Sequence, residues 1–139
     1  MSDSAWEMEA NFKELHSTRR HYSNLRFLII PVYIGLNSGL LLGVREYLFG
    51  SWQLGGVRML LPIGLLLLAS IFFVVFRLIE NVLNSYLDFL RDEAADQYPN
   101  GFLHKIPQTA GSVHSHIMLL YWSIFVSWWA LIAARLSAG

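Results

Sequence analysis

Two histidines, His114 and His116, open the third apolar stretch of the chain. Neutral imidazole is a common metal ligand and takes up a proton near neutral pH. Residues two apart on a helix point to different sides, so His114 and His116 cannot share one metal ion. A membrane haem usually needs two facing histidines, and His16, His21 and His104 all lie in polar segments. One histidine could still ligate a chlorin pigment, or supply half of a haem site completed by another subunit. Hydrogen bonding at the membrane interface is the simpler interpretation.

No catalytic site is recognisable in the sequence. It contains no HExxH, GxSxG or Walker motif and no pair of carboxylates inside an apolar stretch. Asp92, Glu93 and Asp96 are more typical of a solvated helix face than of a metal site. The chain has no cysteine, which excludes disulfides and thiolate metal ligands. We therefore predict no enzyme activity, no metal site and no cofactor beyond the haem or chlorin alternative at His114 or His116.

Small and polar residues mark two faces of the first apolar stretch. Gly35, Gly39 and Gly43 form two consecutive GxxxG steps, a spacing that lets a second helix approach closely. We expect this stripe to pack against another helix of the same chain or, alternatively, against a second copy. Asn37, with Tyr33 beside it, stands roughly 200° round the helix from Gly35. Because an amide in hydrocarbon needs a partner, this second face should meet protein or water.

The third apolar stretch carries a comparable stripe of polar and small residues: His116, Ser123, Ser127, Ala130 and Ala134. Its other sides are bulky, with Trp122, Phe125, Trp128 and Trp129. We expect the bulky side chains to face lipid and the small ones to face protein. The two serines should bond backbone carbonyls or close a tight helix interface.

Three apolar stretches must position these residues. Phe27–Val44, Met59–Phe76 and Ile117–Ala134 contain no charged residue and no histidine, and each has about the length that crosses a bilayer core. In hydrocarbon the backbone must satisfy its own hydrogen bonds, and the alternation of barrel strands is missing, so the stretches should be helices. Of the 139 residues, 55% are hydrophobic and only 14% charged, too few to cover a soluble globule.

Two amphipathic segments extend the first two apolar stretches. Their apolar seams are Met8, Phe12, Leu15, Arg19 and Tyr22 in one segment, and Ile79, Val82, Leu83, Tyr86, Phe89 and Leu90 in the other. Glu80 is expected on the opposite, polar side. Antiparallel pairing of the seams would form a stalk, with Arg20 beside Glu80 or Asp88 and Lys13 beside Asp88 or Asp92. The alternative, two helices lying flat on the membrane, requires a basic polar face, whereas the second segment is acidic.

The predicted fold is all-α: an integral membrane protein with three transmembrane helices, the first two extended into a cytoplasmic antiparallel helical stalk. We expect one domain over residues 1–139, with an amphipathic helix at 5–24, spans at 25–47 and 57–77, a helical extension at 78–97, a loop at 98–111 and a third span at 112–136. The first helix should run almost without interruption from Ala5 to Tyr47, with Pro31 as a possible kink.

Lysine and arginine positions predict the orientation. Seven precede the first span or lie between the second and third: Lys13, Arg19, Arg20, Arg26, Arg77, Arg91 and Lys105. Three lie on the other side: Arg45, Arg58 and Arg135. The positive-inside rule then predicts a cytoplasmic N-terminus and an outside C-terminus, and we expect a multi-pass protein of a bacterial inner membrane.

A three-helix chain has little interior of its own, so we expect it to function inside an assembly. The predicted function is a non-enzymatic, homo-oligomeric pore or channel-like membrane assembly, with either the Tyr33–Asn37 face or the His116–Ser127 face toward the axis. The alternative is an accessory or anchor subunit of a larger membrane complex, binding a pigment, haem or quinone near the third helix. The net charge of zero argues against a general nucleic-acid-binding role. The expected partners are the lipid bilayer and other protein chains.

Overall fold

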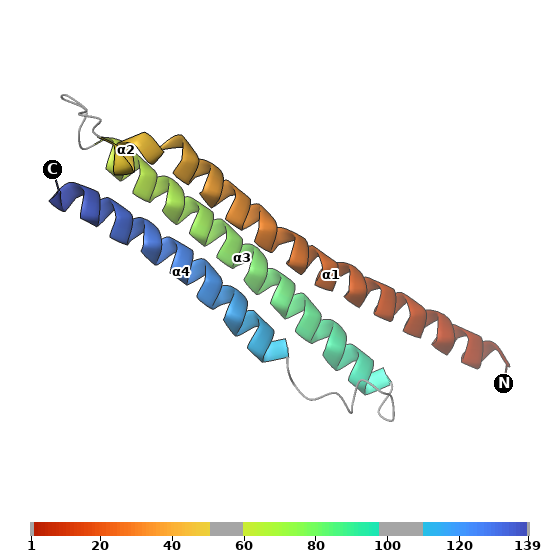
Figure 1. Ribbon diagram of the computed structural model, residues 1–139. Coiled ribbons are helices and arrows are strands. Elements are labelled where there is room, and N and C mark those ends of the chain that lie inside the picture. The colour runs from red at the N-terminus through yellow and green to blue at the C-terminus, as the bar shows by residue number, and fades with distance from the viewer. Residues whose placement is uncertain (1, 51–59, 98–109, 139) are drawn as a thin grey trace.

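Three long helices lie side by side in the computed structural model, which describes residues 2–50, 60–97 and 110–138 (Figure 1). The helices are α1 (Ser2–Gly43), α2 (Arg45–Phe49), α3 (Leu60–Gln97) and α4 (Ala110–Ser137). Every element in these described ranges is helical, and α1, α3 and α4 are each long and apolar enough to cross a membrane. The predicted all-helical fold with three candidate membrane spans is therefore confirmed.

The end of the first long helix differs from the prediction. α1 continues through Pro31 and ends at Gly43, and the chain resumes as the short helix α2. The interruption allows Tyr47 and Leu48 of α2 to be buried against the first turns of α3 and the last turns of α4. The predicted start of the second span at 57 and most of the loop at 98–111 lie outside the described residues.

Helix α3 lies between α1 and α4 and runs antiparallel to both (Figure 1). Two hydrophobic clusters join the three helices. One contains Tyr47, Leu48, Leu65, Ala69, Trp128 and Ile132, and the other contains Tyr33, Phe73, Phe76, Ile117 and Tyr121. In lipid such clusters stabilise the bundle mainly by close packing, because lipid tails are as apolar as the side chains.

The pairing of α1 with α3 differs in register from the predicted pairing. Tyr22 stacks on Tyr86 with ring centroids 5.3 Å apart. Arg26, and not Arg20, forms the ion pair with Glu80. The register of α1 against α3 is set by the aromatic contacts and the buried ion pair. The spacing of charged residues in the sequence could not predict either contact.

The apolar seams predicted for residues 5–24 and 78–97 are partly wrong. Met8 and Phe12 are exposed, and the Lys13 ammonium lies 2.7 Å from the carboxylate of Glu9 on its own helix. On α3 the buried face instead follows Phe73, Phe76, Glu80, Leu83 and Ala94, whereas Ile79, Val82, Tyr86 and Phe89 are exposed. Glu80 therefore lies on the buried face of α3.

Apolar side chains cover most of the outer surface of the bundle. In the most apolar 18-residue segment of each long helix, only a small share is buried within the chain: 17% in α1, 28% in α3 and 22% in α4. Leu28, Leu42 and Leu119 are each more than 60% exposed. Such a surface is costly in water but not in hydrocarbon, which agrees with the three candidate spans.

Candidate functional site

A buried ion pair joins α1 to α3. Arg26 and Glu80 are 4% and 1% exposed, respectively. The Arg26 Nε atom donates to Glu80 Oε1 at 2.7 Å, and the Arg26 Nη2 atom donates to the same oxygen. Nη2 also donates to Asn84 Oδ1 at 3.1 Å. Buried charges persist only where they are paired and hydrogen-bonded, and this pair meets both conditions.

His114 brings α4 into the same network. Its Nδ1 atom lies 3.1 Å from Glu80 Oε1 and 3.3 Å from Arg26 Nη2. With Nδ1 as the donor, His114 bonds the carboxylate that Arg26 also binds. Three helices thus meet at one carboxylate. The network constrains the relative heights of the three helices, because hydrogen bonds are directional.

The two histidines at the start of α4 are not brought together. His114 turns inward to Glu80, whereas His116 is exposed. Any ligation through His114 would have to use Nε2, since Nδ1 is engaged. Within residues 2–50, 60–97 and 110–138 no group of three or more metal-ligating side chains could hold a metal ion.

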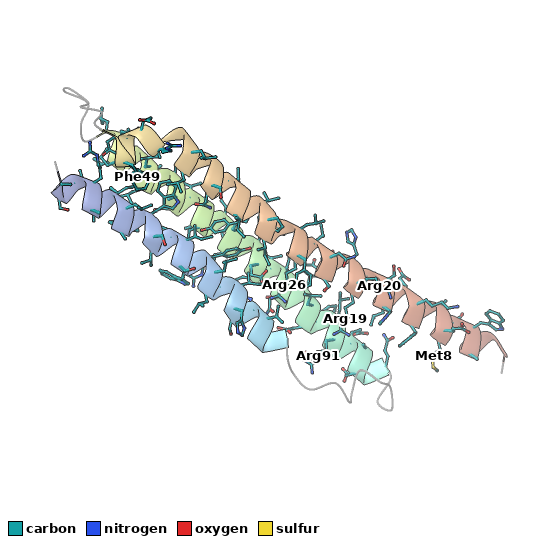
Figure 2. The ribbon with its side chains drawn as sticks, viewed as in Figure 1. Met8, Arg19, Arg20, Arg26, Phe49 and Arg91 are labelled. Carbon is teal, nitrogen blue, oxygen red and sulfur yellow. The ribbon has the colours of Figure 1, made fainter. Side chains whose placement is uncertain are left out.

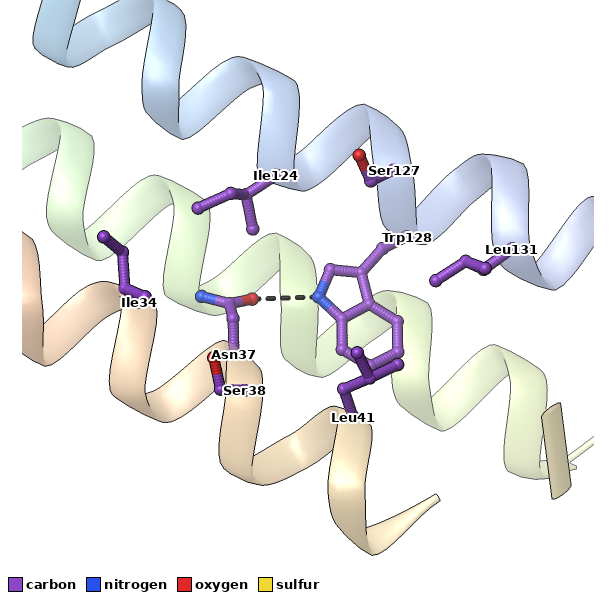
Figure 3. A pocket seen from close by; sticks show the side chains of 8 residues that line it. All are labelled: Ile34, Asn37, Ser38, Leu41, Ile124, Ser127, Trp128 and Leu131. Carbon is purple, nitrogen blue, oxygen red and sulfur yellow. Dashed lines mark hydrogen bonds between the residues drawn. The ribbon is translucent and has the colours of Figure 1, made fainter. Parts of the chain in front are cut away.

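Asn37 forms a second buried polar contact, further into the apolar stretch. Its Nδ2 atom donates to the Tyr33 carbonyl at 2.8 Å, and its Oδ1 atom accepts from Trp128 Nε1 at 2.9 Å (Figure 3). Trp128 is 3% exposed, so the prediction that it faces lipid is wrong. An indole N–H in hydrocarbon needs an acceptor, and Asn37 provides one across the bundle.

Three aromatic rings pack between the two polar contacts. Tyr33 lies 4.5 Å from Tyr121 and 4.9 Å from Phe76, measured between ring centroids. The Tyr33 hydroxyl donates to the Tyr121 carbonyl at 3.4 Å, a long bond. The Tyr121 hydroxyl is buried with no hydrogen-bond partner among the described residues.

A cavity of about 270 Å³ opens between α1 and α4 beside Asn37 (Figure 3). Its lining is mostly apolar and comprises Ile34, Asn37, Ser38, Leu41, Ile124, Ser127, Trp128 and Leu131. The Asn37 amide and the Trp128 indole face each other across it, so their hydrogen bond spans the gap between the two helices.

The glycine stripe of α1 faces away from α3 and α4. Gly35, Gly39 and Gly43 are exposed, and a Cβ atom added at any of them would meet no atom of the described residues within 4 Å. The expectation that the stripe packs against another helix of the same chain is therefore wrong. The physical reason is that α1 turns its Tyr33–Asn37 face inward, where the polar groups find partners. Contact with a second copy stays a prediction.

The small stripe of α4 also faces outward. Ser123, Ser127 and His116 are all exposed. The Ser123 hydroxyl donates to the Leu120 carbonyl at 2.9 Å, and the Ser127 hydroxyl donates to the Ser123 carbonyl at 2.7 Å. Each serine is thus bonded to its own helix, and Ser127 also lines the cavity between α1 and α4. That the rest of this stripe faces protein stays a prediction.

The sequence interpretation missed Arg26, Glu80 and Asn84 as site residues. One signal could have identified Glu80: it follows Phe76 by four positions and precedes Leu83 by three. This spacing puts all three on one helix face. A carboxylate within an apolar seam next to a membrane span is a candidate functional group.

The fold and these contacts define a class, an all-helical chain with three helices long and apolar enough to span a membrane and a buried polar network between them. No protein-family model, no curated protein and no solved structure matches this chain.

Proposed function

We propose that several copies of this chain assemble in a membrane into a non-enzymatic, homo-oligomeric pore or channel-like structure. The observation that carries the proposal is the open glycine stripe of α1. Gly35, Gly39 and Gly43 lie on an exposed face, and no described residue occupies the space where their side chains would be. In lipid, helices associate where small residues allow their backbones to approach. A helix of a second copy fits this face.

The exposed stripe of small and polar residues on α4 is a second surface that could take part in the assembly. It combines exposed serines and a histidine, Ser123, Ser127 and His116, with the small residues Ala130 and Ala134. In a closed ring each copy contacts its two neighbours through different faces. In this proposal the glycine stripe makes one of these contacts, and the α4 stripe faces the axis. Tyr33 and Asn37 bond within the three-helix unit, which favours the α4 stripe as the lining.

Orientation and the stalk are part of the same proposal. The N-terminus is cytoplasmic and the C-terminus outside, in a bacterial inner membrane, as the seven-to-three distribution of lysine and arginine favours. The two chain ends lie at opposite ends of the bundle, as three crossings require (Figure 1). A cytoplasmic stalk requires α1 and α3 to pair outside their uncharged stretches. The stacking of Tyr22 on Tyr86 supports this pairing.

Reconstitution into liposomes tests the conducting activity. Vesicles loaded with potassium ions or a small dye should leak faster with the protein than without it. A Ser127→Leu variant should reduce the leak, because leucine makes the lining more apolar and narrower. Tight vesicles containing the correctly inserted protein would contradict the pore. Purification with a fixed partner chain or a visible absorption band would instead favour the accessory-subunit alternative.

A further inference from the structure

A second cavity lies beside the buried ion pair, on the side toward the N-terminus of α1. It encloses about 200 Å³, and its walls include Arg19, Arg26 and Phe27 of α1, Asp88 and Arg91 of α3, and Val113 of α4. Figure 2 labels Arg19, Arg26 and Arg91 along the same stretch of α1 and α3. The three long helices therefore all contribute to it.

Two arginines of this cavity have unused donors. Among the described residues, neither Arg19 nor Arg91 makes a hydrogen bond or ion pair, although both side chains are half-buried. Arg26 differs, because Glu80 and Asn84 engage it. A guanidinium presents a planar fork of N–H donors that matches the oxygens of a phosphate. Two guanidinium groups from different helices, Arg19 of α1 and Arg91 of α3, make a suitable phosphate-binding site.

The charges around the cavity leave one positive charge uncompensated. Arg19, Arg26 and Arg91 contribute three positive charges, while Glu80 and Asp88 contribute two negative ones. Asp88 also accepts a hydrogen bond from Asn84 at 3.0 Å. A singly charged phosphodiester would balance the remaining charge.

The position of the cavity indicates where such a phosphate would come from. Phe27, on one wall, begins the first uncharged stretch and is 60% exposed. Val113, on another wall, is 38% exposed. The cavity thus has both basic and apolar side chains in its walls, and it lies where the first uncharged stretch begins. Anionic lipids have the same arrangement at a membrane surface.

We infer that this cavity binds the phosphate of an anionic phospholipid. Arg19 and Arg91 donate to the phosphate oxygens, and an acyl chain lies along Phe27 and Val113. The bound lipid neutralises the cavity and joins α1 to α3 next to the Arg26–Glu80 pair. The inference does not depend on the number of copies in the assembly or on pore activity.

Native mass spectrometry of the full-length protein in detergent tests this site. The probes are phosphatidylglycerol and phosphatidylcholine with identical acyl chains. The wild type should retain phosphatidylglycerol preferentially. The Arg19→Gln/Arg91→Gln variant should bind it at least about tenfold more weakly, because two charged donors are lost. Asp88→Asn should tighten binding several-fold, a gain that misfolding could not produce.

A matched variant separates this site from general electrostatic attraction. Arg20→Gln/Arg77→Gln removes the same charge from exposed positions outside the cavity, and should leave phosphatidylglycerol binding nearly unchanged. An equal loss in both double variants, or no loss in either, would overturn the inference. Displacement of the lipid by millimolar inorganic phosphate would also overturn it, because the cavity would then be a site for free phosphate.

Discussion

The Arg26 Nε atom lies 2.7 Å from Oε1 of Glu80, a residue 54 positions further along the chain. Both side chains are buried, and His114 of the third long helix approaches the same oxygen. One carboxylate therefore links α1, α3 and α4. Because the chain has two apolar clusters but little enclosed interior, this link should contribute strongly to the stability of the three-helix unit.

Replacing Glu80 should destabilise the bundle severely. Glu80→Gln leaves the buried Arg26 charge uncompensated, which costs roughly 3–5 kcal/mol where one partner of a buried pair is removed. The free energy of unfolding can be measured by titrating sodium dodecyl sulfate into mixed micelles at fixed protein concentration. Asp92→Asn is the control, since Asp92 is exposed, and should change stability by less than about 0.5 kcal/mol.

The double variant Arg26→Met/Glu80→Met gives a second test of the ion pair. It removes both charges, so it should lose less stability than Glu80→Gln alone. If the double variant were as unstable as the sum of the two single methionine variants, the two side chains would be acting independently and the pairing would be refuted.

The two neighbouring tryptophans of α4 should respond differently. Trp128→Phe removes the indole donor that Asn37 accepts at 2.9 Å and should lower stability by about 0.6–1.7 kcal/mol. Trp129→Phe, at a position 51% exposed, should have almost no effect. In an Asn37→Ala background the loss from Trp128→Phe should shrink; an unchanged loss would show that the hydrogen bond contributes nothing.

Removing the Tyr121 hydroxyl should be harmless or stabilising. The hydroxyl is buried without a partner among the described residues, so Tyr121→Phe replaces an unsatisfied polar group with an apolar ring and should gain up to about 1 kcal/mol. Tyr33→Phe is the comparison, because Tyr33 donates to the Tyr121 carbonyl, and it should lose a little stability. A marked loss for Tyr121→Phe in the same unfolding titration would contradict this description.

The glycine stripe should be needed for assembly but not for folding. Gly39→Leu places a large side chain where a second helix would approach, so the copies should separate while helix content by circular dichroism is retained. Gly64→Leu is a matched control, because Gly64 lies on α3 with equally free space around it. Size-exclusion chromatography with light scattering measures the outcome. Equal behaviour of the two variants would show that the stripe has no special role.

Much of the fold could be predicted from the sequence because hydrocarbon allows few structures. Three uncharged stretches of membrane-crossing length must be helices, and the structure has α1, α3 and α4 there. The break after Gly43 was missed, since nothing in the local sequence forbids a helix to Tyr47. It depends on the burial of Tyr47 and Leu48 against α3 and α4, a long-range contact.

Which face of each helix turns inward was harder to predict. In a membrane helix the inner and outer faces are both apolar: Ile29 and Ile30 pack inward, whereas Leu28 is exposed. Periodicity therefore could not choose between the glycine stripe and the face containing Asn37. The choice follows from hydrogen bonding, because the Asn37 amide needs a partner in hydrocarbon and the glycines do not.

The buried network was missed for a related reason. Arg26 and Glu80 lie at the edges of apolar stretches, where charged residues usually reach water. Only the pairing of α1 with α3 and α4 shows that they face each other.

The mass of the wild-type particle extracted in a mild detergent, measured by native mass spectrometry or light scattering, tests self-assembly most directly. The account predicts a single closed species containing several copies of the 15.9 kDa chain, with no other protein bound. A particle with the mass of one chain, at concentrations where the protein remains folded, would contradict it.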